Sequence, residues 1–215
     1  ADVFSTVSAR QADALYGELA LAGRLGHRTF DWPFVHAVPN AAYPLYADLK
    51  RDPAAAAEDV PTEAFSVLWT GGFNSWTDPE LIVEALRRAM EAEPSIHFVA
   101  TGGAVRGHEE TVFAKFQDLA AARLPADRVR LLGWVETERV VALHARADVG
   151  LCVDTPNVET RFGARNRLTN LLAAGVPVVT TAGTEIAEWI AENRAGAVVA
   201  PNDAEALARA LLEAA

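Results

Sequence analysis

The sequence contains a single cysteine, Cys152, and one methionine among its 215 residues. One cysteine excludes an internal disulfide and any zinc site built from several cysteines. It lies in the apolar run 149–153, where a free cysteine is typically a small buried hydrophobic residue rather than a nucleophile. No apolar run is long enough to span a bilayer, and the sequence shows no secretory signal peptide.

Basic charge is also scarce, with 19 Lys and Arg against 29 Asp and Glu and a net charge of −10. Non-specific binding of nucleic acid needs a basic face, so we expect no nucleic-acid partner. We expect a cytoplasmic protein, with a place at the membrane periphery as an alternative for the full-length form. The chain lacks an initiator methionine, and its first residues, ADVFSTVS, already have the composition of a core strand. They predict a fragment of a longer protein.

Short apolar segments alternate with longer amphipathic ones from Phe65 onward. This alternation predicts an α/β fold, a Rossmann-like parallel sheet with helices on both faces, in which ligands bind beyond the carboxyl ends of the strands. The expected strands contain FSVLW, IHFVAT, RVRLLG, DVGLC, PVVTT and GAVVA. The expected helices cover 78–92, 109–123, 137–146, the segment from about 164, 184–193 and 203–214.

The part before Phe65 follows a different pattern. Residues 1–40 hold two strand candidates, 2–8 and 34–40, around one helical segment. Residues 41–63 mix charge, alanine and proline without an amphipathic period, which predicts a mobile linker. The main domain is therefore expected at 64–215.

Several strand-to-helix turns are rich in glycine, including Thr70-Gly71-Gly72 and Thr101-Gly102-Gly103. Glycine lets backbone amides approach a phosphate or a sugar closely, although tight turns of this kind need glycine in any case. The sequence lacks the Lys-Ser/Thr of a P-loop and a G-x-G-x-x-G after a strand, so a dinucleotide-binding domain is disfavoured.

The turn at 154–166 is long and polar, and it precedes a helix that begins with two arginines, Arg165 and Arg167. Basic residues are disfavoured at a helix N-terminus, so their presence suggests a bound anion. Arginine can hold a phosphate with two parallel donors, and Glu159 could accept hydrogen bonds from sugar hydroxyls. The alternative is a surface cluster of Glu and Arg. Asn170, one turn beyond Asn166, continues the polar edge of the helix, which would suit the ribose of a nucleoside diphosphate.

Four segments together resemble the donor-binding C-terminal domain of group 1 (family four) glycosyltransferases, which are retaining enzymes of the two-domain GT-B type. The resemblance covers about residues 64–215. Residues 1–40 look like the last strand and helix of the acceptor domain and its crossover, so most of that domain would be missing. The segments are WTGGFNSWTDPELIVEAL, VRLLGWVETERVVALHARADVGL, ETRFGARNRLTNLLAAGVPVVTTAGTEIAEWI and GAVVAPNDAEALARAL.

The resemblance implies a role for particular residues. Glu159 matches the first of two paired glutamates, which faces the donor sugar, and with Arg165 it is expected to be catalytic. Trp134 either stacks on the base or caps the core. The implied donor contacts are Gly71 and Gly72 at phosphate and sugar, Gly133, Trp134 and Val135 beside the base, and Gly163, Ala164 and Arg165 at the diphosphate.

The sequence departs from the family pattern at two points. The second glutamate, which holds the ribose, is replaced by Asn170, or by Arg167 when the position is counted forward from Glu159. Asn74 stands near the place of the usual basic residue after the first glycine turn. We therefore expect Arg165 and Arg167 to supply the missing positive charge, with Asn74 and Asn170 as further donor-binding residues.

These features predict a hexosyltransferase fragment that binds a nucleotide-diphosphate sugar and needs no cofactor. The five histidines show no metal-ligand spacing, so no metal site is expected. His144 lies on an amphipathic helix and is expected to be packed, whereas His108 follows a glycine turn, where packing and function are both open. The chain alone is expected to be inactive and to self-associate through residues 1–22. Two alternatives stay open: a GT-B nucleotide-sugar epimerase, and a non-catalytic nucleotide- or sugar-binding domain.

Overall fold

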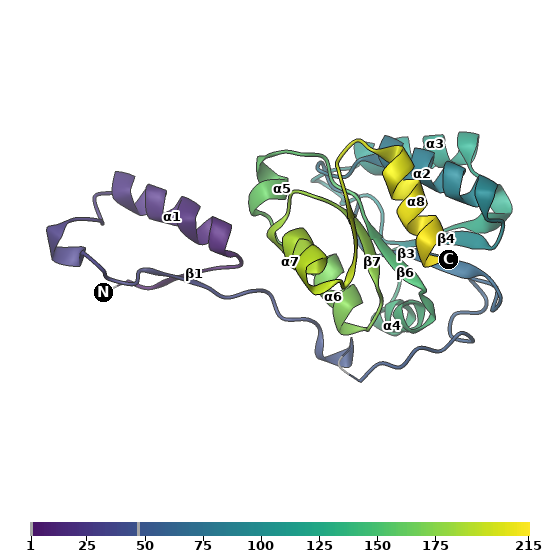
Figure 1. Cartoon of the computed structure of the whole chain (residues 1–215), viewed down its shortest axis with the longest axis horizontal. Helices are drawn as coiled ribbons and strands as arrows, with labels where there is room; N and C mark the ends of the chain where they lie inside the picture. The colour runs from purple at the N-terminus through teal and green to yellow at the C-terminus, as the bar shows by residue number, and fades with distance from the viewer. Residues whose placement is uncertain (1, 47) are drawn as a thin grey trace.

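The computed structural model describes residues 2–46 and 48–215, and its larger part is a six-stranded parallel sheet with helices on both faces (Figure 1). The predicted α/β fold is thus confirmed. The strand order is β5-β4-β3-β6-β7-β8, so the chain starts at β3 in the middle, builds to one edge and then returns to β6 on the other side. This reversal leaves a crevice at the carboxyl ends of β3 and β6, the usual ligand position in such sheets.

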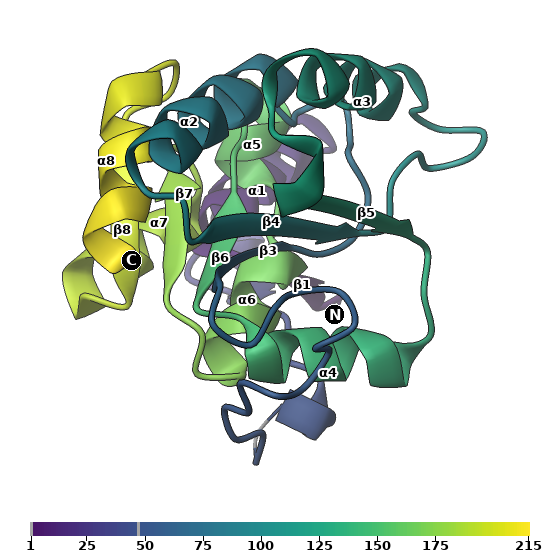
Figure 2. The ribbon, with the colours of Figure 1, turned by 90° about the vertical axis from the view of Figure 1, so that its right-hand side faces the viewer.

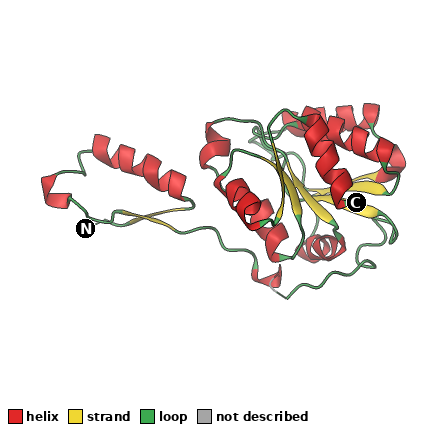
Figure 3. Ribbon diagram, in the orientation of Figure 1, coloured by secondary structure: helices red, strands yellow, loops and turns green. Residues whose placement is uncertain are grey.

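The elements alternate along the chain as the sequence predicts (Figure 3). The strands are β3 (Phe65–Trp69), β4 (Ile96–Thr101), β5 (Val129–Gly133), β6 (Val149–Cys152), β7 (Val178–Thr181) and β8 (Gly196–Val199). The helices are α2 (Pro79–Ala92), α3 (Thr111–Arg123), α4 (Thr137–Arg146), α5 (Val158–Phe162), α6 (Asn166–Ala173), α7 (Glu185–Asn193) and α8 (Ala204–Ala214), with a 3-10 turn η3 at Ala126–Arg128. Within the described residues, none of the helices is both long and apolar enough to cross a membrane.

The sequence does not predict the short helix α5, because its pattern indicates only a long loop at 154–166. Asn157 caps this single turn by accepting a hydrogen bond from the Thr160 N–H at 2.8 Å. A capped turn of five residues has no room for an amphipathic period, so the sequence pattern does not reveal it.

Helices lie on both faces of the sheet (Figure 2), and the core of the main domain consists of two apolar clusters, one on each face. Helices α2, α3 and α8 cover one face, and α4, α6 and α7 cover the other. Successive side chains of a strand point to opposite faces, so in β3 Val67 and Trp69 join the first cluster and Leu68 joins the second. All three are completely buried, which explains the continuous apolar run in this central strand.

Before the main domain, the chain forms a small unit that projects away from it (Figure 1). Among its described residues the unit has only three buried hydrophobic residues, Leu19, Phe34 and Val35, so it buries little apolar surface by itself. Its elements are β1 (Phe4–Thr6), α1 (Ala9–Leu21), a 3-10 turn η1 (His27–Thr29) and β2 (Val35–Ala37), and its two strands pair in parallel.

This unit is fastened to the main domain at the N-terminus of α1. The Glu185 carboxylate, at the start of α7, accepts hydrogen bonds from the backbone N–H groups of Ala9 at 3.1 Å and Arg10 at 3.0 Å. The Arg10 side chain donates to the Gly183 carbonyl at 2.7 Å and pairs with Glu188. A carboxylate at a helix N-terminus is electrostatically favourable, so these contacts stabilise the docked arrangement.

The predicted linker, 41–63, lies along the main domain. A 3-10 turn η2 (Pro44–Tyr46) buries Tyr46, and Val60 belongs to the core cluster under α4 and α6. The buried Arg146 fixes the end of the segment by donating to the Pro61 carbonyl at 2.7 Å. Residue 47 of this segment and residue 1 of the predicted N-terminal region lie outside the described residues.

Candidate functional site

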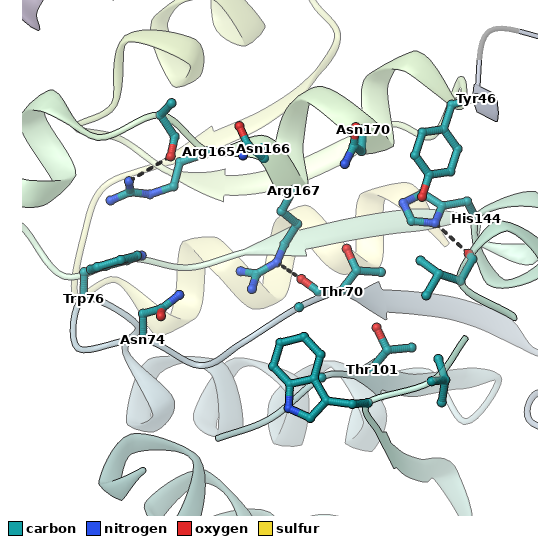
Figure 4. A pocket seen from close by; sticks show the side chains of 16 residues that line it. Tyr46, Thr70, Asn74, Trp76, Thr101, His144, Arg165, Asn166, Arg167 and Asn170 are labelled. Carbon is teal, nitrogen blue, oxygen red and sulfur yellow. Dashed lines mark hydrogen bonds between the residues drawn. The ribbon is translucent and has the colours of Figure 1, made fainter. Parts of the chain in front are cut away.

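A pocket of about 460 Å³ opens at the carboxyl edge of the sheet, between α4 and α6 (Figure 4). Arg167 lies near its middle, with Asn74 and Trp76 toward one end and Tyr46 and His144 at the other. The lining residues are Tyr46, Thr70, Gly71, Asn74, Trp76, Thr101, Gly102, Trp134, Val135, Val140, His144, Ala164, Arg165, Asn166, Arg167 and Asn170.

This pocket collects most of the residues that the sequence singles out. Those that line it are Gly71, Asn74, Trp134, Val135, Ala164, Arg165, Arg167 and Asn170. Those that adjoin it without lining it are Gly72, Gly133, Glu159 and Gly163. The structure brings these residues together, and their individual roles in binding stay predictions.

Three glycines lie next to one another in the turns where β3, β4 and β5 end. Gly71, Gly102 and Gly133 have positive φ angles of 88°, 80° and 69°. The Gly102 N–H donates to the Gly133 carbonyl at 2.6 Å, and a Cβ on Gly102 would lie 2.4 Å from the Gly71 backbone. A side chain at Gly102 would therefore push the turns apart, which explains glycine at this position.

The Arg167 side chain lies beside the first of these turns, and its partners there are uncharged. Its guanidinium donates to the carbonyl of Thr70 and, at 2.9 Å, to that of Gly72, and it lies 3.6 Å from the centroid of the Trp69 ring. No carboxylate in the described part of the chain forms an ion pair with it. Burial lowers the pKa of Arg167 from its usual value, but a guanidinium stays protonated in proteins. Arg167 therefore brings to the pocket a positive charge that no carboxylate of the described residues pairs with directly, although the Asp154 carboxylate acts on it from a longer distance.

Arg165 differs, because its charge is matched inside the protein. Its Nε lies 2.6 Å from Oδ2 of Asp154, and both side chains are buried. The guanidinium also lies 3.6 Å from Oε1 of Glu159 and 5.1 Å from the Trp76 ring centroid. A Cβ on Gly163 would lie 2.6 Å from the backbone carbonyl oxygen of Glu159, which cannot move aside as a side chain can, so glycine is needed at this position. The sequence expectation that both arginines wait for an anion fits Arg167 better than Arg165.

Helix α6 begins at the pocket without a side-chain cap. Arg165 occupies the N-cap position but makes no capping hydrogen bond, and the first helical bond joins the Thr169 N–H to the Arg165 carbonyl at 3.2 Å. The amides of residues 166–168 consequently have no acceptor among the described residues. Free amides and the helix dipole together favour an anion at this point.

Asn170, which replaces the family's second glutamate, is bound to the segment that precedes the main domain. Its Oδ1 accepts a hydrogen bond from the Tyr43 N–H at 3.1 Å, and one turn earlier Oδ1 of Asn166 accepts one from Asn40 at 2.7 Å. Because the Asn170 oxygen is engaged, the group it offers to a ligand is its NH₂ donor. A glutamate would offer an acceptor.

Tyr46 and His144 line the pocket although the sequence does not place them there. Their ring centroids are 4.5 Å apart with an interplanar angle of 37°. His144 is packed, as predicted, with 2% exposure, but it also forms part of the pocket wall. The sequence signal for Tyr46 is weak: two tyrosines, Tyr43 and Tyr46, in a segment otherwise rich in alanine and charge.

Potential metal ligands do not cluster within the described residues. Across residues 2–46 and 48–215, no group of three or more His, Cys, Asp or Glu is arranged to hold a metal ion, and metal-independent binding stays a prediction. Cys152 is buried beside Arg167, and burial raises the pKa of its thiol to about 11. The thiol is thus protonated at neutral pH, which agrees with a packing role.

The sequence of the main domain, residues 64–215, matches the family of group 1 glycosyl transferases. The chain belongs to this family. The match begins at residue 64, one residue before β3, and ends at residue 215. No match was found among curated protein sequences.

Solved structures of glycosyltransferases share the fold of the whole chain, including the N-terminal unit. Anabaena HepE, solved with UDP and glucose and also with UDP-glucose, aligns with a TM-score of 0.71 at 16% identity for the first of these complexes. A glycosyltransferase from Rickettsia africae aligns with a TM-score of 0.71 at 18% identity. Each alignment covers 99% of this chain and 53% of the other, so the chain spans about half the length of these proteins. At these identities the likeness shows the fold alone.

Proposed function

We propose that the pocket binds a nucleoside-diphosphate sugar and that the whole protein is a glycosyltransferase that uses it as donor. One observation carries this proposal: Arg167, a cation with only neutral partners, lies next to the uncapped N-terminus of α6. A diphosphate would accept hydrogen bonds from the guanidinium and from the free amides at the same time. The family supports this proposal, as does the solved complex of HepE with UDP-glucose.

In this proposal, transfer of the sugar leaves a nucleoside diphosphate whose negative charge grows as the glycosidic bond breaks. Arg167 and the α6 amides stabilise that charge, a task that a metal ion performs in other enzymes. Binding and transfer should therefore need no divalent metal. Transfer with retention and a hexosyl donor follow from the family resemblance.

Glu159 and Arg165 take linked roles. Glu159 lies on α5 with a side chain that is 52% exposed, so it can reach a sugar at the pocket mouth. The charge of Arg165 is balanced by Asp154. Its role is therefore to hold Glu159 in place, and it does not bind the diphosphate by itself. Asn170 donates its NH₂ group to a ribose hydroxyl oxygen.

A glycosyltransferase of this type also needs an acceptor domain. We propose that the small N-terminal unit belongs to such a domain, and that this chain alone binds donor without transferring sugar. Nothing in residues 2–46 and 48–215 forms a second complete domain that could position an acceptor hydroxyl. Self-association through residues 1–22 would be an alternative way to cover that unit.

A second candidate is a non-catalytic nucleotide-binding domain. It is favoured by Asn170, which stands in place of a carboxylate and whose oxygen is occupied by Tyr43. The two candidates differ in an assay of donor hydrolysis: an enzyme site releases nucleoside diphosphate slowly even without acceptor, whereas a sensing domain releases none.

Isothermal titration calorimetry of the chain with UDP, GDP, CDP and ADP tests the proposal. At least one should bind, and EDTA should leave its affinity unchanged. Loss of binding in EDTA with recovery on adding magnesium or manganese would contradict metal independence. Failure of all four to bind would contradict the proposed donor site.

A further inference from the structure

The pocket has two chemically different ends. The end that Trp76 lines, together with Arg167 near the middle of the pocket and the free amides at the start of α6, suits phosphate (Figure 4). The opposite end is closed by Tyr46 and His144, which together supply aromatic surface and polar atoms. A nucleoside diphosphate with its phosphates at the first end would therefore extend its nucleoside toward the second.

His144 presents one fixed hydrogen-bond acceptor at this end. Its Nδ1 lies 2.8 Å from the Val140 carbonyl, which can only accept, so Nδ1 carries the proton. Burial lowers the pKa of His144, which keeps the ring neutral and leaves a lone pair on Nε2. This Nε2 atom is buried and has no hydrogen-bond partner among the described residues. A buried acceptor without a partner costs free energy, and a donor on a ligand would relieve that cost.

Tyr46 adds a hydroxyl beside this acceptor. Its ring packs against the His144 ring, and Figure 4 shows both side chains at the same end of the pocket. No hydrogen bond of the Tyr46 hydroxyl occurs within the described ranges. Burial raises the pKa of Tyr46, so the hydroxyl keeps its proton and can donate to a carbonyl.

We propose that His144 and Tyr46 read the base of the nucleoside diphosphate and select uracil and guanine over cytosine and adenine. This inference rests on the proposed donor site and names its substrate class. Uracil and guanine carry a ring N–H next to a ring carbonyl, the pattern that an acceptor beside a hydroxyl donor would match. In a base of the same size held in the same register, the corresponding ring nitrogen of cytosine or adenine carries no hydrogen, so its lone pair would face the lone pair of Nε2. The amino group of these bases could reach Nε2 only if the base shifted by one position, against the register that the bound phosphates and ribose set.

The selection depends on the hydrogen bond between Nδ1 of His144 and the Val140 carbonyl, because this bond fixes the ring proton on Nδ1. A free histidine could move its proton to the other nitrogen and accept either class of base, but that change would break the bond to the Val140 carbonyl. Sites that leave a buried polar group unpaired reject the wrong ligand strongly. His144 is thus a specificity-determining residue in this inference.

Titration calorimetry with four nucleoside diphosphates, at slightly alkaline pH, tests the selection. UDP should bind at least about tenfold more tightly than CDP, and GDP more tightly than ADP by a similar factor. UDP methylated at N3, which lacks the ring N–H, should bind the unmodified protein no better than CDP. This last comparison needs no variant and therefore does not depend on the folding of a mutant.

Two variants assign the effect to His144. His144→Phe keeps a ring against Tyr46 but removes the acceptor. It should lower UDP affinity and, because the opposing lone pair is gone, raise CDP affinity, so that the two nucleotides bind about equally. His97→Phe is the matched control, because its Nδ1 also lies near a backbone carbonyl, that of Ser95 at 2.9 Å, yet it lies at the start of β4 away from the pocket.

The outcomes separate this inference from the function on which it rests. Equal affinity for all four nucleotides, or undiminished binding of N3-methyl UDP, would overturn base selection and leave the donor site standing. A UDP preference that survives in His144→Phe would overturn the role of this residue. Failure of every nucleotide to bind would overturn the donor site and the selection together.

Discussion

Arg165 and Asp154 form a buried ion pair, 2.6 Å between Nε and Oδ2, which ties the loop that follows β6 to the residue before α6. The second carboxylate oxygen of Asp154, Oδ1, is buried and has no partner among the residues described. The charge of Asp154 therefore depends on Arg165, and the pair shapes the loop that carries Glu159.

Replacing Arg165 by alanine should destabilise the fold, because it leaves the Asp154 carboxylate buried and unpaired. We expect the free energy of unfolding to fall by about 3–5 kcal/mol, as for other broken buried pairs. Urea denaturation measures this loss. The double variant Asp154→Leu with Arg165→Met should recover most of it, and a loss below about 1 kcal/mol for Arg165→Ala would show that the pair behaves like an exposed one.

Replacing Arg167 by methionine should weaken binding of nucleoside diphosphates by about 1.5–3 kcal/mol, the range for hydrogen bonds to charged groups. Binding of the nucleoside without phosphates should change little, because the lost contact is to phosphate. Calorimetry with both ligands makes the comparison. The control is Arg88→Met, an arginine on α2 that pairs with Glu84 far from the pocket. Equal losses for nucleoside and diphosphate would mean that Arg167 acts only by holding the glycine turn.

His144 should make stability depend on pH. Burial lowers its pKa in the folded state below the ordinary value of 6.5, so the unfolded chain takes up a proton that the folded chain resists. Its contribution is therefore complete above pH 6.5 and is lost as the pH falls toward the folded pKa. The slope in the free energy of unfolding can reach about 1.4 kcal/mol per pH unit. Urea titrations across this range should show a smaller slope for His144→Phe, and an identical slope would contradict the assignment.

Replacing Glu185 by alanine should loosen the N-terminal unit, since its carboxylate accepts two hydrogen bonds from the start of α1. Hydrogen exchange should rise across β1, α1 and β2 while the main sheet stays protected, and the lost cap corresponds to about 0.5–2 kcal/mol. Glu192→Ala is the control, because this exposed residue lies two turns further along the same face of α7 and forms no hydrogen bond or ion pair with the described residues of the unit. Unchanged exchange in Glu185→Ala would show that the unit is held by other contacts.

The sequence is sufficient to predict the fold of the main domain because its strands are mostly apolar runs and several of its helices, α2, α7 and α8 among them, carry clear caps. Asp78 before α2 is an example: its carboxylate accepts the Leu81 N–H at 3.0 Å, as a residue of that type before a proline suggests. The glycines at the ends of β3, β4 and β5 likewise lie where turns of positive φ require them. These features are local, so a single sequence displays them.

The site can be located from the sequence, but the partners of its charged groups cannot. Arg165 and Arg167 are separated by a single residue and look alike in the sequence, yet one meets Asp154 and the other meets backbone carbonyls. Which partner each finds depends on how β3, β6 and α6 come together. The sequence pattern misses Tyr46 for the same reason, since its contact with His144 joins segments far apart in the chain.

The segment before the main domain limits how far the protein can be shortened from its N-terminus, because Asn40, Tyr43 and Tyr46 contact the main domain. The family match starts at residue 64, but Val60 lies in the core and the Pro61 carbonyl binds the buried Arg146. A shortened chain that began just before Val60 would keep these contacts, the sheet, the glycine turns and α6. It would lose the ring that packs on His144 and the backbone N–H that engages Asn170. The smallest unit that folds and the smallest unit with an intact nucleoside pocket are therefore different lengths of chain, and shortening the protein from its N-terminus should change ligand affinity before it changes the fold.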